Sequence, residues 1–456
     1  MKREEFLRWF NSDFWRAFKT KTLPIEIPRT GKEKANLLDE LFADVESARY
    51  APSIPEVELI MNKGHGVART IPVLSIRDYC VYYFCIKELE EVLCVNRTPN
   101  TFGGWTLGGR LRKMESDQIE SDLSEYGRYS FNPQAWTKAF GEFNSLLFSQ
   151  LESGQYAYVL QLDLANFYDC VRLDILERWI REEAQADKGW VITLLFYLLN
   201  HWNRRNTGLH PQAVGLPQDA LADCSRILAN FYLQKFDQFA SKICNQVAGE
   251  YFRYADDQMI LLADTAKVES LLLLLTRRLD QFGLRVNQKK VEIWGAQELA
   301  EHRCRHIQAI FSSQDGGSQN PILVKRFVKA YFSLSVEKLE ASWNGGLPLL
   351  NRLLFADLES LSSKLFGKLM SRFFSKEFLQ QATAKKLLRV SELNDLCAKP
   401  IDFPKRLESL AENSVHNLFH YEVRAFARNS NDDVLEKLIT RRIKQLDQLM
   451  RSGAIE

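Results

Sequence analysis

Two apolar stretches of this sequence run into aspartates, and this pattern restricts the fold more than any other feature. Residues 156–164, YAYVLQLDL, form an apolar run that reaches Asp163 near its end. Residues 249–264, GEYFRYADDQMILLAD, are typical of two strands joined by a polar turn, which contains Asp256 and Asp257. A carboxylate beside a buried strand is costly unless it is paired or binds a metal ion. We therefore expect neighbouring strands whose acidic ends meet.

Three carboxylates gathered at one edge of a sheet would repel one another. They stay ionised together only if divalent cations neutralise them. Two Mg²⁺ ions about 4 Å apart are the usual solution, and such a pair serves in-line attack at a phosphorus atom. One ion would lower the pKa of a primer hydroxyl, and the other would hold the triphosphate and the departing pyrophosphate. The pattern therefore predicts metal-dependent nucleotidyl transfer.

The composition excludes some classes of protein but names no partner. The chain has 456 residues, of which 46% are hydrophobic and 26% charged, and its net charge is only +2, so any basic surface must be local. Its longest apolar run, SLLLLLT at 270–276, is too short to span a bilayer, and its N-terminus lacks the apolar region of a signal peptide. The eight cysteines include no Cys-x-x-Cys pair. We expect reduced thiols in a cytoplasmic protein without a membrane partner.

Hydrophobic periodicity and breaks in it divide the chain into regions. Aromatic residues recur at helical spacing over residues 4–18, which predicts one packing helix there. The segment SSQDGGSQNP at 312–321 is rich in turn residues and is expected to be a boundary. We predict an N-terminal helical extension at 1–66, a mixed α+β region at 67–312 and an all-α domain at 321–456. An α-solenoid of paired, HEAT-like helices is one arrangement open to the last region.

Taken in order, these blocks resemble those of reverse transcriptases across about residues 65–295. LDLANFYD and the YADD turn are similar to the palm of that family, although a Tyr-x-Asp-Asp tetrapeptide alone also fits an Asp-rich hairpin turn. The resemblance implies a right-hand polymerase, in which fingers and an RRM-like palm sheet precede an all-α domain that replaces or extends the thumb. It implies an RNA-directed DNA polymerase that uses dNTPs and Mg²⁺, for which Mn²⁺ can substitute, to make a DNA product.

The resemblance also assigns the metal ligands and a sugar gate. Asp163 and Asp256 would bind both ions, with Asp257 as the less direct third acid. The backbone carbonyl of Leu164 would help to hold the ion on the triphosphate side. Tyr168 falls at the family's sugar gate, where an aromatic ring leaves no room for a 2′-hydroxyl and so selects dNTPs. Simple core packing is the alternative for Tyr168.

Four further side chains match positions that contact the nucleotide in the family. Arg69 and Arg77 are candidates to touch the triphosphate, since guanidinium groups suit phosphate oxygens, and a surface salt bridge is the alternative for each. Gln218, in the segment GLPQ, would lie beside the nucleotide and the template. Lys290 would approach the pyrophosphate as a general acid, and its neighbour Lys289 competes for that role.

Departures from the common pattern point to one branch of the family. Asp219 stands where most members have glycine, and Ser225 arrives slightly late. The run Ser-Arg-Ile-Leu-Ala is more like the bacterial abortive-infection and "unknown group" lineages, which act in antiphage defence. That branch implies RNA-templated or untemplated synthesis, a nucleic-acid or protein primer, a noncoding RNA partner and homo-oligomers. Arg110, Arg112 and Arg128 all compete for the role of a template-gripping arginine.

Two other functions fit the same residues. A retron- or intron-type reverse transcriptase would copy one specific cognate RNA. A non-catalytic nucleic-acid-binding assembly protein could retain a palm fold, but it would not need an intact set of three aspartates, whose mutual repulsion is otherwise a cost.

A few histidines and one cysteine lie outside these blocks. His302, Cys304 and His306 occupy alternate positions, and on a strand such residues would face one side and could bind zinc. A fourth ligand is not evident nearby. His416 and His420 lie one helical turn apart and lack the acid of a zinc helix, so they are expected to be packing or surface residues.

Overall fold

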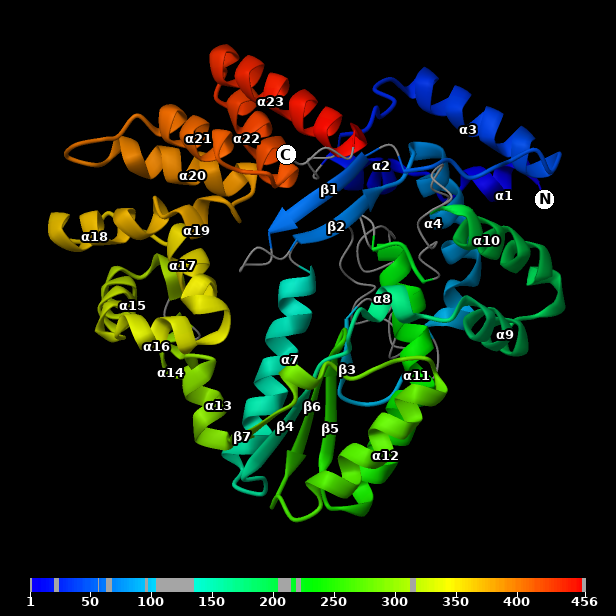
Figure 1. Ribbon diagram of the computed structural model, residues 1–456, viewed down its shortest axis with the longest axis horizontal. Coiled ribbons are helices and arrows are strands. Elements are labelled where there is room, and N and C mark those ends of the chain that lie inside the picture. Colours follow the sequence, from blue (N-terminus) through cyan, green and yellow to red (C-terminus); the bar gives the residue numbers. More distant parts are fainter. Residues whose placement is uncertain are drawn as a thin grey trace. The chain divides into compact units, whose positions relative to one another are not determined.

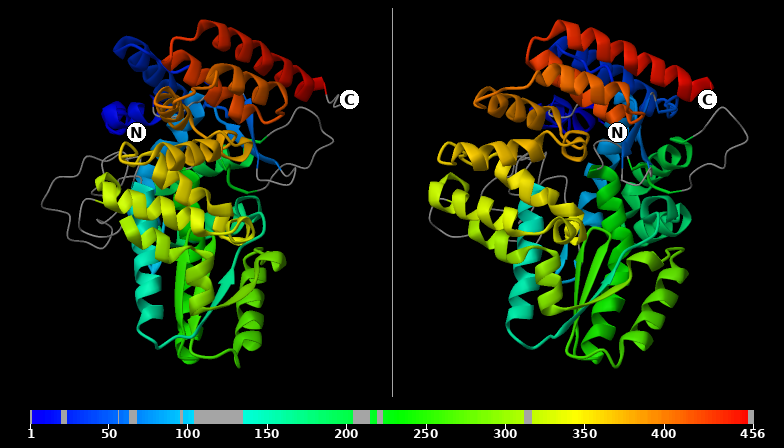
Figure 2. Two further views of the ribbon diagram at one scale, coloured as in Figure 1. Left: turned by 90° about the vertical axis from the view of Figure 1, so that its left-hand side faces the viewer. Right: turned by 60° about the vertical axis from the view of Figure 1, so that its left-hand side comes forward.

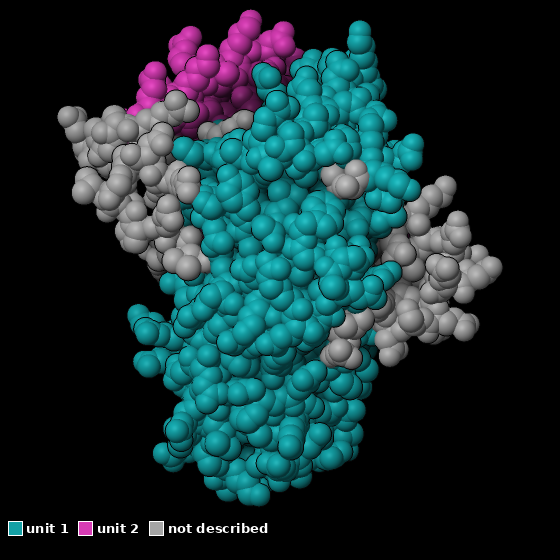
Figure 3. Space-filling view, turned by 90° about the vertical axis from the view of Figure 1, so that its right-hand side faces the viewer, with its two compact units in different colours: residues 1–58, 72–296 teal, residues 59–71, 297–456 magenta. Residues whose placement is uncertain are grey.

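The chain forms two compact units. The computed structural model describes residues 2–19, 24–55, 57–62, 68–94, 97–103, 135–203, 215–218, 223–311 and 317–452. Unit 1 consists of residues 1–58 and 72–296, and unit 2 consists of residues 59–71 and 297–456 (Figure 3). Unit 1 is mixed α+β, whereas unit 2 is helical apart from its part of one β-hairpin. The boundaries expected near residues 66 and 312 remain predictions.

Unit 1 contains a five-stranded sheet surrounded by helices (Figure 1). Its strands are β3 (Thr101–Phe102), β4 (Tyr158–Leu162), β5 (Glu250–Tyr254), β6 (Asp257–Leu262) and β7 (Glu292–Gly295). Its α-helices are α1 (Arg3–Leu7), α2 (Ser12–Lys19), α3 (Gly31–Glu46), α4 (Ile76–Leu93), α7 (Ala135–Glu152), α8 (Phe167–Cys170), α9 (Leu173–Glu183), α10 (Gly189–His201), α11 (Asp223–Gln246) and α12 (Val268–Gln281). Short 3₁₀ turns are η2 (Ala186–Lys188) and η3 (Gln288–Lys290).

The strand order of this sheet is β3-β5-β6-β4-β7. The pairs β5–β6, β4–β6 and β4–β7 are antiparallel, and β3 lies parallel to β5. Helices α7 and α11 both pack against β5, and α12 packs against α11 (Figures 1 and 2). The central strands β4 and β6 are therefore held between neighbours on both sides. Strands β5 and β6 confirm the expectation of two strands joined by a polar turn.

The N-terminal segment differs from its prediction in one respect. Aromatic side chains at Phe6, Phe10, Phe14 and Phe18 are buried, as helical spacing suggested. The expected single helix over residues 4–18 is nevertheless divided into α1 and α2. The side chain of Asn11 accepts a hydrogen bond from the N–H of Phe14 (3.1 Å), which is how an N-cap starts a new helix.

Unit 2 is built from a succession of short helices. They are α13 (Ala296–His302, whose first residue falls in unit 1), α14 (Arg305–Gln308), α15 (Pro321–Ser333), α16 (Val336–Ala341), α17 (Leu347–Leu354), α18 (Ser363–Phe373), α19 (Lys376–Leu379), α20 (Ala384–Asp395), α21 (Phe403–Glu412), α22 (Asn417–Asn429) and α23 (Asp433–Ser452), with 3₁₀ turns η4 (Ala309–Phe311), η5 (Gly317–Gln319) and η6 (Trp343–Gly346). Helix α22 packs against α20, α21 and α23, and α21 also packs against α23. The α-solenoid arrangement remains a prediction.

A β-hairpin shares in unit 2. Strands β1 (Val57–Asn62) and β2 (Ala68–Val73) pair with each other, and residues 59–71 belong to unit 2. Within this unit, the backbone N–H of Ile60 donates to Oδ1 of Asn417, the first residue of α22 (2.6 Å). Asn417 is fully buried. A buried side-chain amide therefore satisfies the N–H group of a strand residue.

None of the helices in the described ranges combines the length and the hydrophobicity that crossing a lipid bilayer requires.

Candidate active site

Two of the predicted acids directly follow the last residue pair of the two central strands. Strand β4 pairs with β6 from Tyr158 opposite Leu262 to Leu162 opposite Gln258. Asp163 and Asp257 directly follow this last pair, so continuing the register by one residue would set them opposite each other. Residues paired in this way share a face of the sheet.

The third acid lies in the turn between β5 and β6. Tyr254 pairs with Asp257, so Ala255 and Asp256 form a two-residue hairpin turn. Ala255 has φ of +54°, in the left-handed region that costs a non-glycine residue roughly 1–2 kcal/mol. The N–H of Ala255 donates to the carbonyl of Phe102 (3.1 Å). This turn is therefore a fixed feature of the sheet edge.

Asp163 is held in place by the loop that follows α12. It is only 6% exposed, and its Oδ2 accepts a hydrogen bond from the side-chain amide of Asn287 (3.1 Å). The backbone N–H of Asn287 donates to the carbonyl of Asp163 (2.8 Å). The ammonium of Lys290 lies 3.1 Å from Oδ1 of Asp163. Of the two lysines that competed in the sequence, Lys290 is thus seen to contact a predicted metal ligand.

The carbonyl of Leu164 points toward the β6 side of its strand. Leu164 and Val286 form an isolated antiparallel bridge. Its hydrogen bonds come from the flanking residues: Ala165 donates to Arg285 (2.8 Å), and Asn287 donates to Asp163. Leu164 is therefore the non-hydrogen-bonded member, whose own N–H and C=O face away from Val286. This orientation directs its carbonyl to the side on which Asp257 begins β6.

Tyr168 is fixed by the turn that contains GLPQ. Its backbone carbonyl accepts a hydrogen bond from the N–H of Leu216 (2.9 Å). The preceding Gly215 lies so close that a Cβ atom there would fall 1.9 Å from the same carbonyl and 2.7 Å from the backbone of Asp169. Only glycine permits this approach. The Tyr168 ring is half-buried and contacts Phe167 (5.4 Å between centroids).

Ser225 has a role that its late position in the sequence did not suggest. Its hydroxyl donates to the carbonyl of Pro217 (2.5 Å). Since a serine hydroxyl has a single hydrogen, the 2.9 Å contact with Tyr82 must be donated by the tyrosine. This buried relay ties the turn before Gln218 to helices α4 and α11. Gln218 itself is half-buried.

The predicted arginines lie in different surroundings. Arg77, on α4, lies 2.5 Å from Asp44 and 4.0 Å from Glu40 of α3, the ion pairing that was the alternative to triphosphate binding. Arg69 is a half-buried residue of β2 within unit 2. Three arginines compete for the template contact, namely Arg110, Arg112 and Arg128, and all of them lie outside the described residues. Asp219 lies outside them too.

The comparisons with known proteins identify the region that contains these acids. Residues 110–307 match the family described as reverse transcriptase (RNA-dependent DNA polymerase). The chain contains a reverse transcriptase domain. By this domain the chain is an RNA-directed DNA polymerase, a nucleotidyltransferase that acts on nucleic acid and dNTPs.

Other comparisons add little to this assignment. No curated protein matches the chain. Among solved structures, one described as apo telomerase from Candida Tropicalis is similar over 90% of this chain and 74% of that chain, with 11% sequence identity. Its TM-score of 0.35 is too low to support any argument.

Reverse transcriptase domains generally use divalent metal ions, and the residue types at this site are chemically suitable ligands for such ions. Asp163, Asp256 and Asp257 offer carboxylate oxygens, which suit Mg²⁺. Their side chains do not form a ready cage, because no group of three or more His, Cys, Asp or Glu within the described ranges is arranged to hold a metal. Instead, the Lys290 ammonium lies against Asp163. The ammonium thus supplies the positive charge beside this carboxylate that a bound metal ion would otherwise supply.

The histidines considered as metal ligands outside the acidic site lie on or next to helices. His302 ends α13 and His306 lies in α14, so the strand-like alternation proposed for His302, Cys304 and His306 was wrong in its geometry. His420 is fully buried, and its ring nitrogens contact the carbonyls of Ala411 (2.8 Å) and His416 (3.0 Å). It is a packing residue, as expected.

One buried charged residue beside the turn between β5 and β6 was missed. Arg253 directly precedes Tyr254-Ala255 and is fully buried, in an ion pair with Asp237 of α11 (2.7 Å). The available signal was a charged residue inside the apolar stretch GEYFRY, because a buried charge requires a partner. The sequence did not indicate which acid that partner would be.

Proposed function

We propose that the reverse transcriptase domain makes DNA from dNTPs at a two-metal site formed by Asp163, Asp256 and Asp257, with Mg²⁺ as the natural ion and Mn²⁺ as a substitute. The observation that supports the proposal is the β4–β6 register, whose last pair, Leu162 and Gln258, directly adjoins Asp163 and Asp257. All three acids lie inside the segment that matches the family. The Leu164 carbonyl, directed toward the same side, would be a further oxygen ligand.

The chain's own residues would supply orientation, selectivity and a proton. Bound divalent ions would lower the pKa of the primer hydroxyl and neutralise triphosphate charge. Asn287 would hold Asp163 in its orientation. Lys290 would donate a proton to the departing pyrophosphate. Tyr168 would exclude a 2′-hydroxyl, and Gln218 would lie beside the nucleotide and template.

The triphosphate contacts would come from arginine side chains. Arg69 and Arg77 are proposed to bind phosphate oxygens through their guanidinium groups. For Arg77 this requires an exchange of partners, because its present ligands are carboxylates of α3. Its side chain is 32% exposed, so a triphosphate in solution can compete for it.

Unit 2 offers a basic surface that suits nucleic acid. It contains 26 lysines and arginines against 19 aspartates and glutamates, a net charge of +7 in a chain whose total is +2. The neighbouring helices α15, α17 and α18 contain no acidic residue. Their basic residues are Lys325, Arg326, Lys329, Arg352, Lys364, Lys368 and Arg372. Clustered cations of this kind neutralise phosphates, which supports a grip on RNA or on the DNA product.

The biological role that we propose is antiphage defence in a bacterial cytoplasm, of the abortive-infection type. It is supported by the resemblance of the Ser-Arg-Ile-Leu-Ala run to that branch, which also motivates untemplated as well as RNA-templated synthesis, a noncoding RNA partner and homo-oligomers. The function of the site does not depend on this role.

The proposal is tested by incorporation of labelled dNTPs by the purified protein with Mg²⁺ and without added template or primer. The variant Asp256→Ala/Asp257→Ala should lose at least about a thousandfold in rate, whereas Asp174→Ala, an exposed carboxylate paired with Arg172, should not. Product that survives RNase pretreatment and shifts with protease would support protein-primed, untemplated synthesis. Product that forms only with one specific RNA would favour the retron- or intron-type function. An aspartate double variant as active as the wild type would refute catalysis at this site.

A further inference from the structure

Arg253 joins helix α11 to the turn that carries the proposed metal ligands. Its Nε and Nη2 donate to the two carboxylate oxygens of Asp237 (2.8 and 2.7 Å), and its Nη1 donates to Oδ1 of Asn230 (2.8 Å). The same Nη1 donates to the carbonyl of Ala255 (2.7 Å). Both side chains of the ion pair are fully buried. A single guanidinium therefore contacts two turns of one helix and the tip of the hairpin.

Ala255 is held through both of its backbone polar groups. The N–H of Ala255 donates to the carbonyl of Phe102 in β3, and its carbonyl accepts from Arg253. On the same side as Phe102, a Cβ atom at Gly103 would lie 3.4 Å from the Ala255 nitrogen, which is ordinary van der Waals contact. A non-glycine residue at φ of +54° persists only where its surroundings determine the conformation. Arg253 provides the side-chain hydrogen bond to the Ala255 carbonyl in these surroundings.

The arrangement requires an arginine in its charged form. Burial raises the pKa of the Asp237 carboxyl, and Arg253 opposes that effect. The carboxylate oxygens of Asp237 accept three hydrogen bonds, two from Arg253 and one from the Tyr251 hydroxyl (2.9 Å). The ionised carboxylate is therefore the form that fits this site. A lysine has one nitrogen in place of three and could not reach Asp237, Asn230 and Ala255 together.

The position of Arg253 in β5 determines on which face of the sheet it contacts the turn. Arg253 pairs with Gln258, and Tyr254 pairs with Asp257. Because successive residues of a strand face opposite sides, Arg253 lies on the α11 face and Asp257 on the other. The guanidinium thus supports the turn from behind, without occupying the side on which the acids gather.

We propose that Arg253 is a positioning residue, which uses its contacts with Asp237 and Asn230 to hold the Ala255 carbonyl and so sets the direction in which Asp256 and Asp257 present their carboxylates to divalent metal ions. The inference rests on the proposed metal-binding function of these two aspartates. It adds a residue that touches neither metal nor nucleotide, yet determines the affinity for the metal.

The test is Mn²⁺ binding to the full-length protein without nucleotide or nucleic acid, followed by electron paramagnetic resonance, beside the Mg²⁺ concentration that gives half-maximal synthesis. In Arg253→Met/Asp237→Leu, apolar side chains of similar volume replace the buried pair, an exchange that proteins often tolerate. We expect a folded protein by circular dichroism, with Mn²⁺ affinity reduced about 10- to 100-fold, as for the loss of other supports of metal ligands. A folded double variant with wild-type Mn²⁺ affinity would overturn the proposal.

A second variant decides the question if the first does not fold. Asn230→Ala leaves the ion pair intact and removes one partner of the Arg253 guanidinium. We expect several-fold weaker Mn²⁺ binding and faster amide hydrogen exchange at Ala255 and Asp256. Wild-type values of both would count against the proposal.

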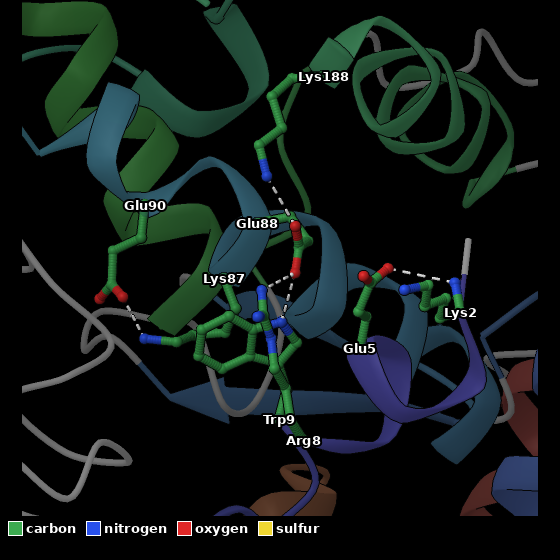
Figure 4. A network of polar contacts seen from close by, with 8 residues as sticks. All are labelled: Lys2, Glu5, Arg8, Trp9, Lys87, Glu88, Glu90 and Lys188. Carbon is green, nitrogen blue, oxygen red and sulfur yellow. Dashed lines mark hydrogen bonds and ion pairs between the residues drawn. The ribbon is translucent and has the colours of Figure 1, made fainter. Parts of the chain in front are cut away.

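A matched control separates positioning from stability. Lys87 and Glu90 form another buried ion pair of unit 1, on α4 (Figure 4). Lys87→Met/Glu90→Leu should change thermal unfolding without changing Mn²⁺ affinity. If Asp256→Ala/Asp257→Ala binds Mn²⁺ as the wild type does, the proposed function fails and the inference with it. If that variant loses Mn²⁺ and the folded Arg253→Met/Asp237→Leu keeps it, only the inference fails.

Discussion

The ammonium of Lys290 lies 3.1 Å from Oδ1 of Asp163, although the two residues are far apart in the sequence. The 3₁₀ turn η3 follows Asn287, whose backbone and side chain both bond to Asp163, and this turn brings Lys290 back to the carboxylate. The lysine side chain is 58% exposed, so it can move between Asp163 and a triphosphate. Lys290 therefore compensates Asp163 in the free protein, and in the proposed mechanism it would approach the nucleotide once this is bound.

The variant Lys290→Ala should retain the fold and lose turnover. If Lys290 gives a proton to pyrophosphate, kcat for dNTP incorporation should fall by about 100-fold or more, with a smaller change in KM. The neighbour Lys289, in the same 3₁₀ turn, provides the control, and Lys289→Ala should stay within about threefold of the wild type. Steady-state kinetics at saturating Mg²⁺ measures both. Equal losses in the two variants would show that general positive charge, and not Lys290, is what matters.

The Gly215→Ala substitution should destabilise the turn that carries Gln218. Its Cβ would meet the Tyr168 carbonyl at 1.9 Å, and backbone atoms cannot yield as a flexible side chain can. We expect a loss of about 1–3 kcal/mol in the free energy of unfolding, measured by urea titration, together with weaker dNTP binding. Gly141→Ala in α7, where a Cβ would meet nothing within 4 Å, should instead stabilise by about 0.5–1 kcal/mol. An unaffected Gly215→Ala protein would mean that the turn is not held against Tyr168.

The substitution Tyr168→Ala should relax the choice of sugar. Removal of the ring opens space for a 2′-hydroxyl, so the ratio of kcat/KM for a dNTP to that for the matching NTP should fall by about 10- to 100-fold. Tyr168→Phe keeps the ring and its contact with Phe167, and should keep the ratio. Competition between dCTP and CTP at fixed template provides the measurement. An unchanged ratio in Tyr168→Ala would reduce Tyr168 to a packing residue.

The strands that carry the acids could be predicted because their signal is local. Apolar runs with few polar residues define β4, β5 and β6, and the turn residues between them define the hairpin. The register that joins Asp163 to Asp257 could not be predicted, because it depends on how two strands far apart in sequence pair. The break between α1 and α2 depended on one side chain, Asn11, which competed with an otherwise continuous helical pattern.

The partners of the buried and half-buried charges could not be predicted either. Nothing in the sequence near Arg253 distinguishes Asp237 from other acids as its partner, and the same holds for Arg77 and Asp44. Such choices are made by tertiary packing, which brings together residues that share no local pattern. Residues 59–71 likewise span the boundary predicted at residue 66 between the N-terminal extension and the fingers, but they group with the C-terminal helices, where Ile60 bonds to Asn417.

The carboxylate of Glu88 on α4 joins three segments of unit 1 (Figure 4). It accepts hydrogen bonds from Trp9 Nε1 (2.7 Å), Arg8 (2.8 Å) and Lys188 (2.8 Å). Burial raises the pKa of Glu88, but the hydrogen bonds from Lys188, Trp9 and Arg8 together outweigh burial and lower it below the ordinary value of 4.5. The ionised form is therefore favoured by folding.

This shift fixes the sign of a pH dependence. Because the pKa of Glu88 is lower in the folded than in the unfolded chain, its contribution to stability is present above about pH 4.5 and is lost as the pH falls through the folded pKa. Glu88→Gln lacks the contribution, so the difference in unfolding free energy between it and the wild type should be largest near neutral pH and shrink toward pH 3.5. Glu91→Gln removes the same charge from the exposed face of α4, and its curve should run parallel to that of the wild type. Urea unfolding between pH 3.5 and 7.5 tests this, and a Glu88→Gln curve that is parallel as well would mean that the three donors do not stabilise the carboxylate.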